Sequence, residues 1–294
     1  MRIIGVINTN AGNYCPREVA RLRDHLQQSS CDGELFEVST LEDAEHVCKE
    51  PADAYAIGGG DGTLARTLSM IDKHNSTETI IPLSLGTMNN LSQFYNAYNG
   101  LEDRVKRALG MTSSAEEVFK KVVHGEYFIH KMQPFKVNDD IGFNVGTGIV
   151  HDMLYNFNTT TGPLPLRMLA TIKKSLSATP RDDPLYFDER RVTGITGLYA
   201  SIYPRASLGL KQVTVKMLPG VSSHVDVAAT RLTPFQLLCN APFTPFKLLP
   251  NTEYTNMREL TVRGPVQYQV DGDTYQADSL RVTRHRPYYL LSKI

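Results

Sequence analysis

Three consecutive glycines open the stretch of this 294-residue sequence that is best suited to chemistry, Gly58–Thr63, which reads Gly-Gly-Gly-Asp-Gly-Thr. It follows an apolar run, Ala54–Ile57. Glycines let a backbone approach a phosphate closely and turn without steric cost. A helix that begins directly after such a loop offers unpaired N–H groups and the positive end of its dipole. The stretch therefore predicts a phosphate-binding loop, to which Thr63 adds a hydroxyl donor.

The loop differs from two common nucleotide-binding motifs. No Gly-Lys-Ser/Thr follows, as in a Walker P-loop, and the spacing is not the G-x-G-x-x-G of dinucleotide-binding proteins. An ordinary strand-to-helix turn is the alternative interpretation, but it needs fewer glycines. An acidic residue beside a phosphate is suited to binding a metal or accepting a proton, which makes Asp61 a candidate catalytic residue.

Two other loops are predicted at the same edge of a sheet. Pro82–Asn90 reads Pro-Leu-Ser-Leu-Gly-Thr-Met-Asn-Asn, and Asn8–Gly12 follows the first apolar run, Ile3–Ile7. Taken alone, the stretch around Gly86 is no more than a capped helix start. Open α/β sheets bind ligands at the carboxyl ends of their strands, however, so the pairing of these loops indicates one site.

The elements that must position these loops alternate along the first 125 or so residues. Short apolar runs are followed by helical patterns, which is typical of βαβ units and a parallel sheet. The expected strands are Ile3–Ile7, Leu35–Val38, Ala54–Ile57 and Ile80–Leu85; the expected helices begin at Pro16, at Leu41 after a Ser39-Thr40 cap, and after Thr63.

After about Glu126 the sequence instead predicts closely spaced strands and an antiparallel, sandwich-like second domain. The domains are expected to be residues 1–128 and 129–294. One helix is expected in the second half, Pro165–Ala178, whose basic residues either form a solvated face or contact a membrane surface. Near the end, Asp271-Gly272-Asp273 is a strong hairpin-turn signal.

The three glycine loops resemble those of the diacylglycerol kinase catalytic domain family, which includes bacterial lipid kinases, sphingosine kinases and ceramide kinases and is distantly similar to NAD kinases. Phe143–Gly148, Gly162–Ser175 and Val270–Asp273 resemble later stretches of the same family. The resemblance implies an α/β fold: a doubly wound N-terminal nucleotide-binding domain, a β-sandwich-like C-terminal domain, an active site in the cleft, and a last strand, Tyr288–Lys293, that packs back on the first domain.

The resemblance also implies the site residues. Asp273 takes the position of the family's proton acceptor, beside Asp61 as the second catalytic residue, and ATP is used with Mg²⁺. The residues that the resemblance places at the nucleotide are Asn8, Gly12, Ser39, Thr40, Gly58, Gly59, Gly60, Asp61, Gly62, Thr63, Leu64, Gly86, Thr87 and Asn89. No protein residue is assigned as a metal ligand.

Several positions depart from the family pattern. Asp273 replaces a glutamate, Asn90 an aspartate and Thr9 a proline, and Ile149-Val150-His151 replaces Phe-Asp-Ala. The family's N-x-x-x-x-G-G-G segment is not found between about residues 198 and 212. Asp226 is the nearest acidic residue to a structural magnesium site present in some bacterial members.

Composition limits the partners. Charge is balanced, with 31 basic and 31 acidic residues and a pI near 7.1, so no general attraction to nucleic acid or anionic lipid is expected. No apolar run reaches the length of a membrane span or resembles a signal peptide. The chain is expected to be cytoplasmic, with only peripheral contact to a membrane.

The sequence thus favours an ATP-dependent lipid kinase that phosphorylates a hydroxyl of a lipid such as diacylglycerol or a sphingoid lipid. A kinase with a soluble substrate, like NAD kinase, is one alternative, and a catalytically inactive nucleotide-binding regulatory protein is another. The lipid and the oligomeric state are not indicated by the sequence.

Overall fold

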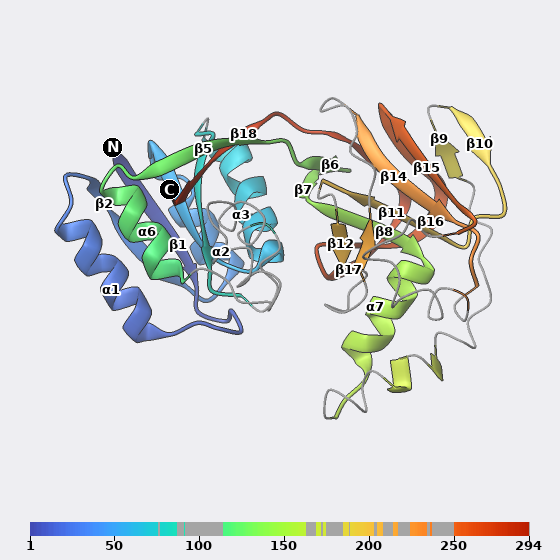
Figure 1. Cartoon of the computed structure of the whole chain (residues 1–294), viewed down its shortest axis with the longest axis horizontal. Helices are drawn as coiled ribbons and strands as arrows, with labels where there is room; N and C mark the ends of the chain where they lie inside the picture. Colours follow the sequence, from blue (N-terminus) through green and yellow to red (C-terminus); the bar gives the residue numbers. More distant parts are fainter. Residues whose placement is uncertain are drawn as a thin grey trace. The chain divides into compact units, whose positions relative to one another are not determined.

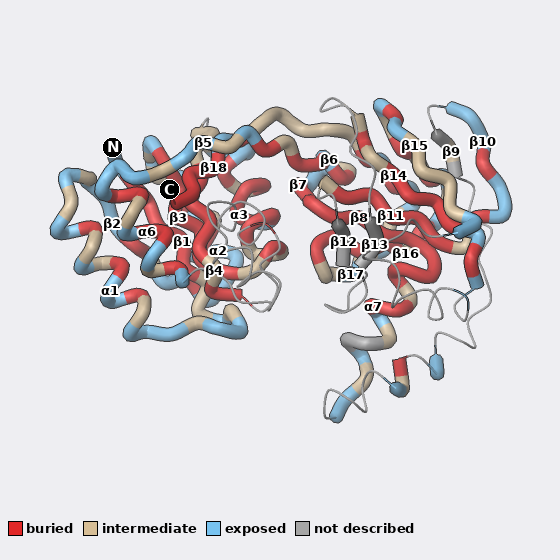
Figure 2. The backbone as a smooth tube through the Cα atoms, viewed as in Figure 1, coloured by how far each residue is buried: buried red, intermediate tan, exposed pale blue. Residues whose placement is uncertain are grey.

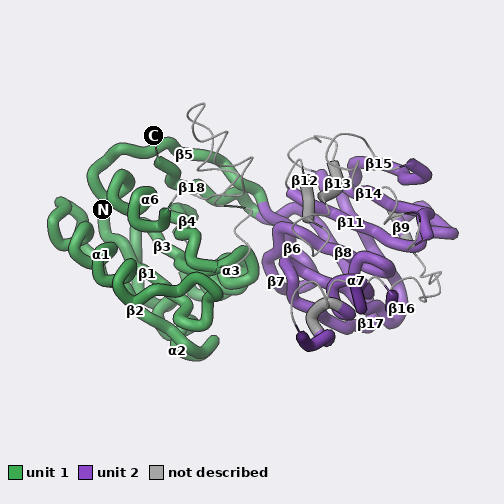
Figure 3. Tube along the Cα trace, turned by 60° about the horizontal axis from the view of Figure 1, so that its bottom comes forward, with its two compact units in different colours: residues 1–133, 286–294 green, residues 134–285 purple. Residues whose placement is uncertain are grey.

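The computed structural model describes residues 1–75, 77–86, 91, 114–162, 169–171, 173–174, 185–187, 189–202, 205–207, 214–216, 224–233, 236 and 250–293. The chain forms two compact units (Figure 3). The first comprises Met1–Gln133 together with Arg286–Ile294, and the second comprises Pro134–His285. The chain therefore leaves the first unit once and returns to it with its last residues.

The first unit is built on a six-stranded sheet with the strand order β2-β1-β3-β4-β18-β5. Its strands are β1 (Arg2–Asn8), β2 (Asp32–Val38), β3 (Ala54–Gly59), β4 (Thr79–Ser84), β5 (Tyr127–Met132) and β18 (Tyr288–Lys293). β1 to β4 are parallel to one another, and β18 runs parallel to β4 and antiparallel to β5. The predicted parallel sheet is confirmed, with β18 and β5 added at one edge.

Helices cover both faces of this sheet. α1 (Pro16–Gln27) and α6 (Ala115–Val123) lie on one side, and α2 (Leu41–Val47) and α3 (Asp61–His74) lie on the other (Figure 1). β1 and β3 are almost wholly buried between them (Figure 2). Alternate residues of a strand face opposite sides, so a strand buried on both faces needs a continuous apolar run. The runs Ile3–Ile7 and Ala54–Ile57 meet that need, which is why the sequence revealed them.

Side-chain caps explain where two of the helices, α2 and α6, begin. The Thr40 hydroxyl accepts from Asp43 N at 3.1 Å while the Asp43 carboxylate accepts from Thr40 N at 3.3 Å, which is a capping box. The Thr40 hydroxyl also lowers the pKa of Asp43. Ser114 caps α6 by accepting from Glu117 N. α6 was not predicted, although Ser-x-x-Glu ahead of an apolar pattern is a helix-start signal.

The second unit contains an antiparallel sheet with the path β15-β14-β11-β8-β16-β17-β6-β7, to which β9 and β10 are added at β16. Its strands are β6 (Phe135–Val137), β7 (Asp140–Gly142), β8 (Asn144–Gly148), β9 (Leu185–Phe187), β10 (Arg190–Val192), β11 (Gly197–Ser201), β14 (Val225–Thr230), β15 (Thr252–Met257), β16 (Glu259–Val270) and β17 (Asp273–Arg284). β12 (Arg205–Ser207) pairs with β13 (Thr214–Lys216) separately. The predicted change from a parallel to an antiparallel sheet is confirmed.

Two details of the second unit differ from the prediction. The apolar runs Leu260–Val262 and Val266–Val270, which as separate runs predict two strands, form one strand, β16, whose register shifts between Arg263 and Val266. A helix, α7 (Ile149–Thr159), follows β8 and was not predicted. The predicted helix Pro165–Ala178 lies mostly outside the described residues. None of the described helices has the length and apolar composition needed to cross a bilayer.

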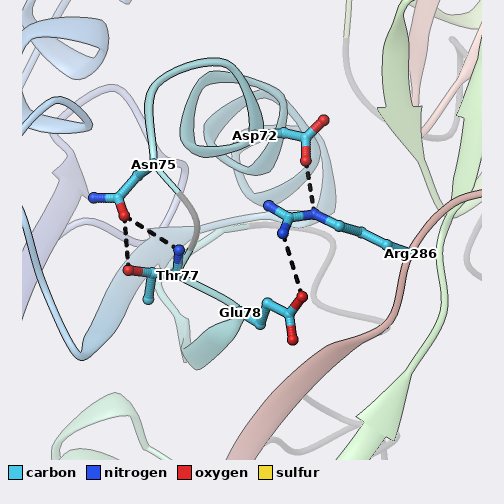
Figure 4. A network of polar contacts seen from close by, with 5 residues as sticks. All are labelled: Asp72, Asn75, Thr77, Glu78 and Arg286. Atoms are coloured by element: carbon cyan, nitrogen blue, oxygen red, sulfur yellow. Dashed lines mark hydrogen bonds and ion pairs between the residues drawn. The ribbon is translucent and has the colours of Figure 1, made fainter.

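The returning segment of the first unit is held by an arginine at its start (Figure 4). Arg286 Nε donates to Asp72 Oδ1 of α3 at 2.8 Å, and its Nη1 donates to Glu78 Oε1 at 3.2 Å. Tyr289 N also donates to the Glu78 carbonyl at 2.8 Å. One guanidinium therefore ties the start of β18 to the end of the helix that begins at the glycine loop.

We expect Arg286→Met to lower the free energy of unfolding by about 1 kcal/mol, because one cation satisfies two carboxylates. Arg281→Met is the matched control, since Arg281 makes a single ion pair with Glu259 and its side chain is 66% exposed, against 32% for Arg286. Urea denaturation of both variants measures the difference. Equal losses in the two variants would contradict the proposed anchoring role.

Candidate active site

The strand order of the first sheet fixes where a ligand site is expected. From β1 the chain moves to β2 on one side and then to β3 on the other, so the direction of winding reverses between β1 and β3. In open α/β sheets this reversal leaves a crevice at the carboxyl ends of the two strands. Asn8 ends β1 and Gly59 ends β3, so the two sequence motifs lie at this point.

A side-chain hydrogen bond joins the two motifs. Asn8 Nδ2 donates to Thr63 Oγ1 at 3.0 Å, linking the end of β1 to the first turn of α3. Asn8 Oδ1 accepts from Asn10 N at 2.9 Å, which shapes the loop after β1. The first bond within α3 runs from Leu64 N to the Gly60 carbonyl at 3.0 Å. The N–H groups of Gly60 to Thr63 therefore precede the helical ladder, where anions bind.

The loop after β4 is pressed against the glycine loop. A Cβ at Gly86 would lie 2.2 Å from Gly60 N and 2.3 Å from Gly60 Cα. Asn13 holds the arrangement, because its Nδ2 donates to the Gly86 carbonyl at 2.7 Å and its N donates to the Leu85 carbonyl at 3.0 Å. The absence of a side chain at Gly86 therefore lets the two backbones meet. Asn13 was not predicted, since a lone asparagine in a loop carries no sequence signal.

The side chain of Asp61 is buried, so it does not face solvent as a free base would. It is only 3% exposed, and its Oδ1 accepts from Leu91 N at 3.1 Å. The carboxylate thus connects the first residue of α3 to the segment after β4. Thr87 and Asn89, also predicted at the nucleotide, lie outside the described residues.

The remaining predicted residues of the first unit border the same edge. Gly12 lies in an exposed turn after β1. Asn10 Nδ2 donates to the Ser39 carbonyl at 2.8 Å, which joins that turn to the end of β2. The Thr40 hydroxyl is engaged in the cap of α2. The structure therefore brings the loops after β1, β2, β3 and β4 together.

The main-chain N–H groups of the glycine loop are suited to binding a chain of phosphates. The loop offers main-chain N–H donors at the positive end of a 14-residue helix, and its glycines leave room for close approach. Among the residues that the structure describes, no cluster of three or more His, Cys, Asp or Glu side chains could hold a metal by itself.

In the second unit, Asp271 and Gly272 form a two-residue hairpin turn. Val270 pairs with Asp273 across β16 and β17, and the φ angles of Asp271 and Gly272 are 49° and 101°. Positive φ at both central residues is the type I′ geometry that matches the twist of the strands. The predicted turn is therefore present, and it fixes Asp273 as the first residue of β17.

Asp271 faces inward from this turn. It is 8% exposed, and its carboxylate accepts from Phe143 N at 2.8 Å, Asn144 N at 2.9 Å and Asn144 Nδ2 at 3.0 Å. Asn144 Oδ1 in turn accepts from Tyr199 OH and Ser201 Oγ. A buried carboxylate needs such donors to offset its desolvation. Asp271 therefore holds the turn against β8.

Asp273 is half-buried at the start of β17. Asp226 forms an ion pair with Arg284 at 3.3 Å, with both side chains largely buried, and accepts from Asn256 Nδ2. Arg284 Nε also donates to the His224 carbonyl at 2.6 Å. This pairing makes Asp226 a structural residue of the second sheet.

The first unit matches a known family, and the fold of the whole chain matches solved structures. Residues 2–126 match the diacylglycerol kinase catalytic domain family. A solved structure of a diacylglycerol kinase from Bacillus anthracis str. Sterne superimposes with a TM-score of 0.67 at 13% identity, covering 98% of this chain and 96% of that chain. A second structure from this organism, described as a candidate diacylglycerol kinase, gives 0.70 at 14% identity with the same coverage. A search of curated proteins finds no match.

We expect Gly86→Ala to weaken ATP binding about tenfold, because an added Cβ would push the β4 loop away from Gly60 and overpacking costs about 1–3 kcal/mol. Isothermal titration with ATP and Mg²⁺ measures the effect. Gly125→Ala is the control, since its φ of +83° strains the chain while its Cβ meets nothing within 4 Å. Wild-type ATP affinity in Gly86→Ala would refute the tight approach of the two loops.

We expect Asp271→Asn to lower the free energy of unfolding by about 3 kcal/mol, because an amide nitrogen would face an N–H group that the carboxylate now satisfies. Asp278→Asn, an exposed position on β17, is expected to change stability by less than about 0.5 kcal/mol. Thermal and urea unfolding provide the comparison. Matching stabilities would show that the three hydrogen bonds contribute little.

Proposed function

We propose that this chain, which carries a diacylglycerol kinase catalytic domain over residues 2–126, transfers the γ-phosphate of ATP to a hydroxyl group of a lipid. The observation that carries the proposal is the glycine loop at the reversal point of the first sheet, where Asn8 is bonded to Thr63. The family match supports a kinase, and the loop supports a nucleotide with several phosphates.

The first unit is proposed to hold ATP. The N–H groups of Gly60 to Thr63 would donate to the phosphate oxygens, with Gly58, Gly59 and Gly86 giving the backbone room. Mg²⁺, when bound with the phosphates, supplies neutralisation of the charge that develops during transfer. Asp61 is proposed as a positioning residue at this loop, because one of its oxygens is already bonded to Leu91 N.

The second unit is proposed to supply the base. An alcohol is a poor nucleophile, and a carboxylate that accepts its proton assists attack on the γ-phosphorus. The hydroxyl oxygen forms the new O–P bond, its proton passes to Asp273, and ADP leaves with the bridging oxygen. Asp271 is unsuited to this role since its carboxylate accepts three N–H donors. Asp273, the first residue of β17, is therefore the carboxylate of this turn that we propose as the base.

The decisive experiment measures labelled phosphate transfer from ATP with Mg²⁺ to mixed micelles of diacylglycerol, sphingosine or ceramide, with NAD as a soluble acceptor. Asp273→Asn is expected to reduce kcat at least about hundredfold through loss of the base while ATP affinity stays as in the wild type. Asp278→Asn is the matched control and is expected to retain activity.

Each other result would change the proposal. Labelled NADP would identify a kinase with a soluble acceptor. ATP binding without any labelled product would favour a regulatory, non-catalytic protein. Full activity of Asp273→Asn would remove that carboxylate from the mechanism and leave the kinase without its proposed base.

A further inference from the structure

The side-chain amide of Asn8 has a direction that its neighbours fix. Its Oδ1 accepts from Asn10 N at 2.9 Å. A main-chain N–H group can only donate, so this contact must be made by the carbonyl oxygen of the amide and not by its nitrogen. The amide nitrogen is therefore the atom that faces Thr63, with Nδ2 at 3.0 Å from Thr63 Oγ1. The amide cannot be turned over without losing the bond to Asn10.

The direction of the Asn8 amide also sets the direction of the Thr63 hydroxyl. An amide nitrogen offers only protons, so the Thr63 oxygen must accept at this contact. A hydroxyl group carries one proton, and that proton has to point away from the N–H group that donates to its oxygen. Thr63 is thus an acceptor toward Asn8 and a donor toward its other side. The hydrogen bonds from Asn10 through Asn8 to Thr63 all run in one direction, so each polarises the next.

The Thr63 hydroxyl lies against the glycine loop. A Cβ built at Gly59 would lie 2.6 Å from Thr63 Cβ and Cγ2 and 2.7 Å from Thr63 Oγ1, so only a glycine at this position leaves room for the threonine. Thr63 is half-buried and stands in the first turn of α3, beside the N–H groups that precede the helical ladder. The hydroxyl is therefore placed where the anion of the candidate site is expected.

The direction of this hydroxyl matters because phosphate oxygens are acceptors. The oxygens of an ionised phosphate only accept hydrogen bonds, and a bond to a charged oxygen is stronger than one between neutral groups. A hydroxyl that presented its lone pairs to the same oxygens would repel them. A threonine without a partner can rotate and present either its proton or its lone pairs. The bond from Asn8 removes this freedom before the ligand binds, which lowers the cost of ordering the site.

We propose that Asn8 is a positioning residue of the phosphate site: by donating to Thr63 Oγ1, it turns the Thr63 hydroxyl proton toward a phosphate oxygen of the nucleotide. This role rests on the proposed function for the identity of its ligand, but it requires only binding and no transfer of phosphate. Asn8 acts through Thr63 and does not itself have to touch the ligand.

A double-mutant cycle on Asn8 and Thr63 tests this role. Asn8→Asp keeps the size of the side chain and the bond from Asn10 N, but its second oxygen would accept the Thr63 proton and turn it away from the ligand. Thr63→Val removes the hydroxyl and keeps the shape of the side chain. ATP with Mg²⁺ is titrated calorimetrically into the full chain without lipid. Urea unfolding of each variant shows that the fold is intact.

We expect Thr63→Val to weaken ATP binding about tenfold, because one hydrogen bond to a charged oxygen is lost. Thr63→Ser keeps a hydroxyl and is expected to bind within about threefold of the wild type. Asn8→Asp is expected to weaken binding about hundredfold, since it loses the same bond and adds a negative charge near the phosphates. The double variant Asn8→Asp/Thr63→Val is then expected to bind as Asn8→Asp does, because the hydroxyl no longer contributes.

Asn10→Asp is the matched control. It adds the same charge two residues further along the loop and leaves Asn10 N, which bonds to Asn8, in place. The Asn10 side chain bonds to the Ser39 carbonyl and not to Thr63. Its effect on ATP binding is therefore expected to multiply with that of Thr63→Val, as for two independent changes.

The outcomes separate this role of Asn8 from the proposed function. Effects of Asn8→Asp and Thr63→Val that multiply overturn the role, whether or not a lipid is labelled. Unchanged ATP affinity in Thr63→Val also overturns it, since the hydroxyl would then donate within its own helix. The expected coupling in a protein that phosphorylates no lipid supports the role and overturns the proposed function. A wild-type chain that binds no ATP overturns both.

Discussion

The contact between the backbones of Gly86 and Gly60 is the constraint on which the candidate nucleotide site depends. A Cβ at Gly86 would lie 2.2 Å from Gly60 N, which is too close for any side chain. The loops after β3 and β4 can therefore meet only if residue 86 is a glycine. Asn13 then fixes the β4 loop from the side of β1, and Asn8 fixes the start of α3. The candidate site is therefore held together by glycines and by the side-chain amides of two asparagines.

In the second unit, the turn between β16 and β17 is also fixed by a few small polar groups. A type I′ turn requires positive φ at two residues, and the sequence places an aspartate and a glycine there. That aspartate, Asp271, also accepts three N–H donors from β8 and the residue before it, so the turn is fixed from within. Asp273, two residues on, pairs with Val270 as the first residue of β17, so the turn also fixes its position in the backbone. One turn thus separates a structural carboxylate from a candidate catalytic one.

The sequence predicted the elements whose burial leaves a clear pattern of apolar residues. β1 and β3 are buried on both faces and read as continuous apolar runs, α2 begins at a Thr40 cap, and α1 begins at a proline. β17 was missed because only two of its residues, Leu280 and Val282, are buried, so most of the stretch reads as a polar segment. α7 was missed although Ile149, Val150, Met153 and Leu154 follow helical spacing, because the first two are β-branched and follow a strand. Of the candidate site, the loops were predicted, whereas Asn13 and Asn144 act through tertiary contacts that a single sequence cannot reveal.

The departures from the pattern of the diacylglycerol kinase family lie in both units, but they differ in what the changed residues contact. Within the described part of the candidate nucleotide site, the glycine loop keeps the family's residues. Thr9, in place of proline, donates to the Val38 carbonyl from both its N and its hydroxyl. In the second unit, Val150 and His151 replace an aspartate and an alanine, and His151 now lines a polar cavity. Phosphate binding imposes the same geometry whatever the acceptor, because the phosphates are always the same. Recognition of an acceptor imposes no single geometry, because acceptors differ, so residues of the second unit can vary where the glycine loop cannot.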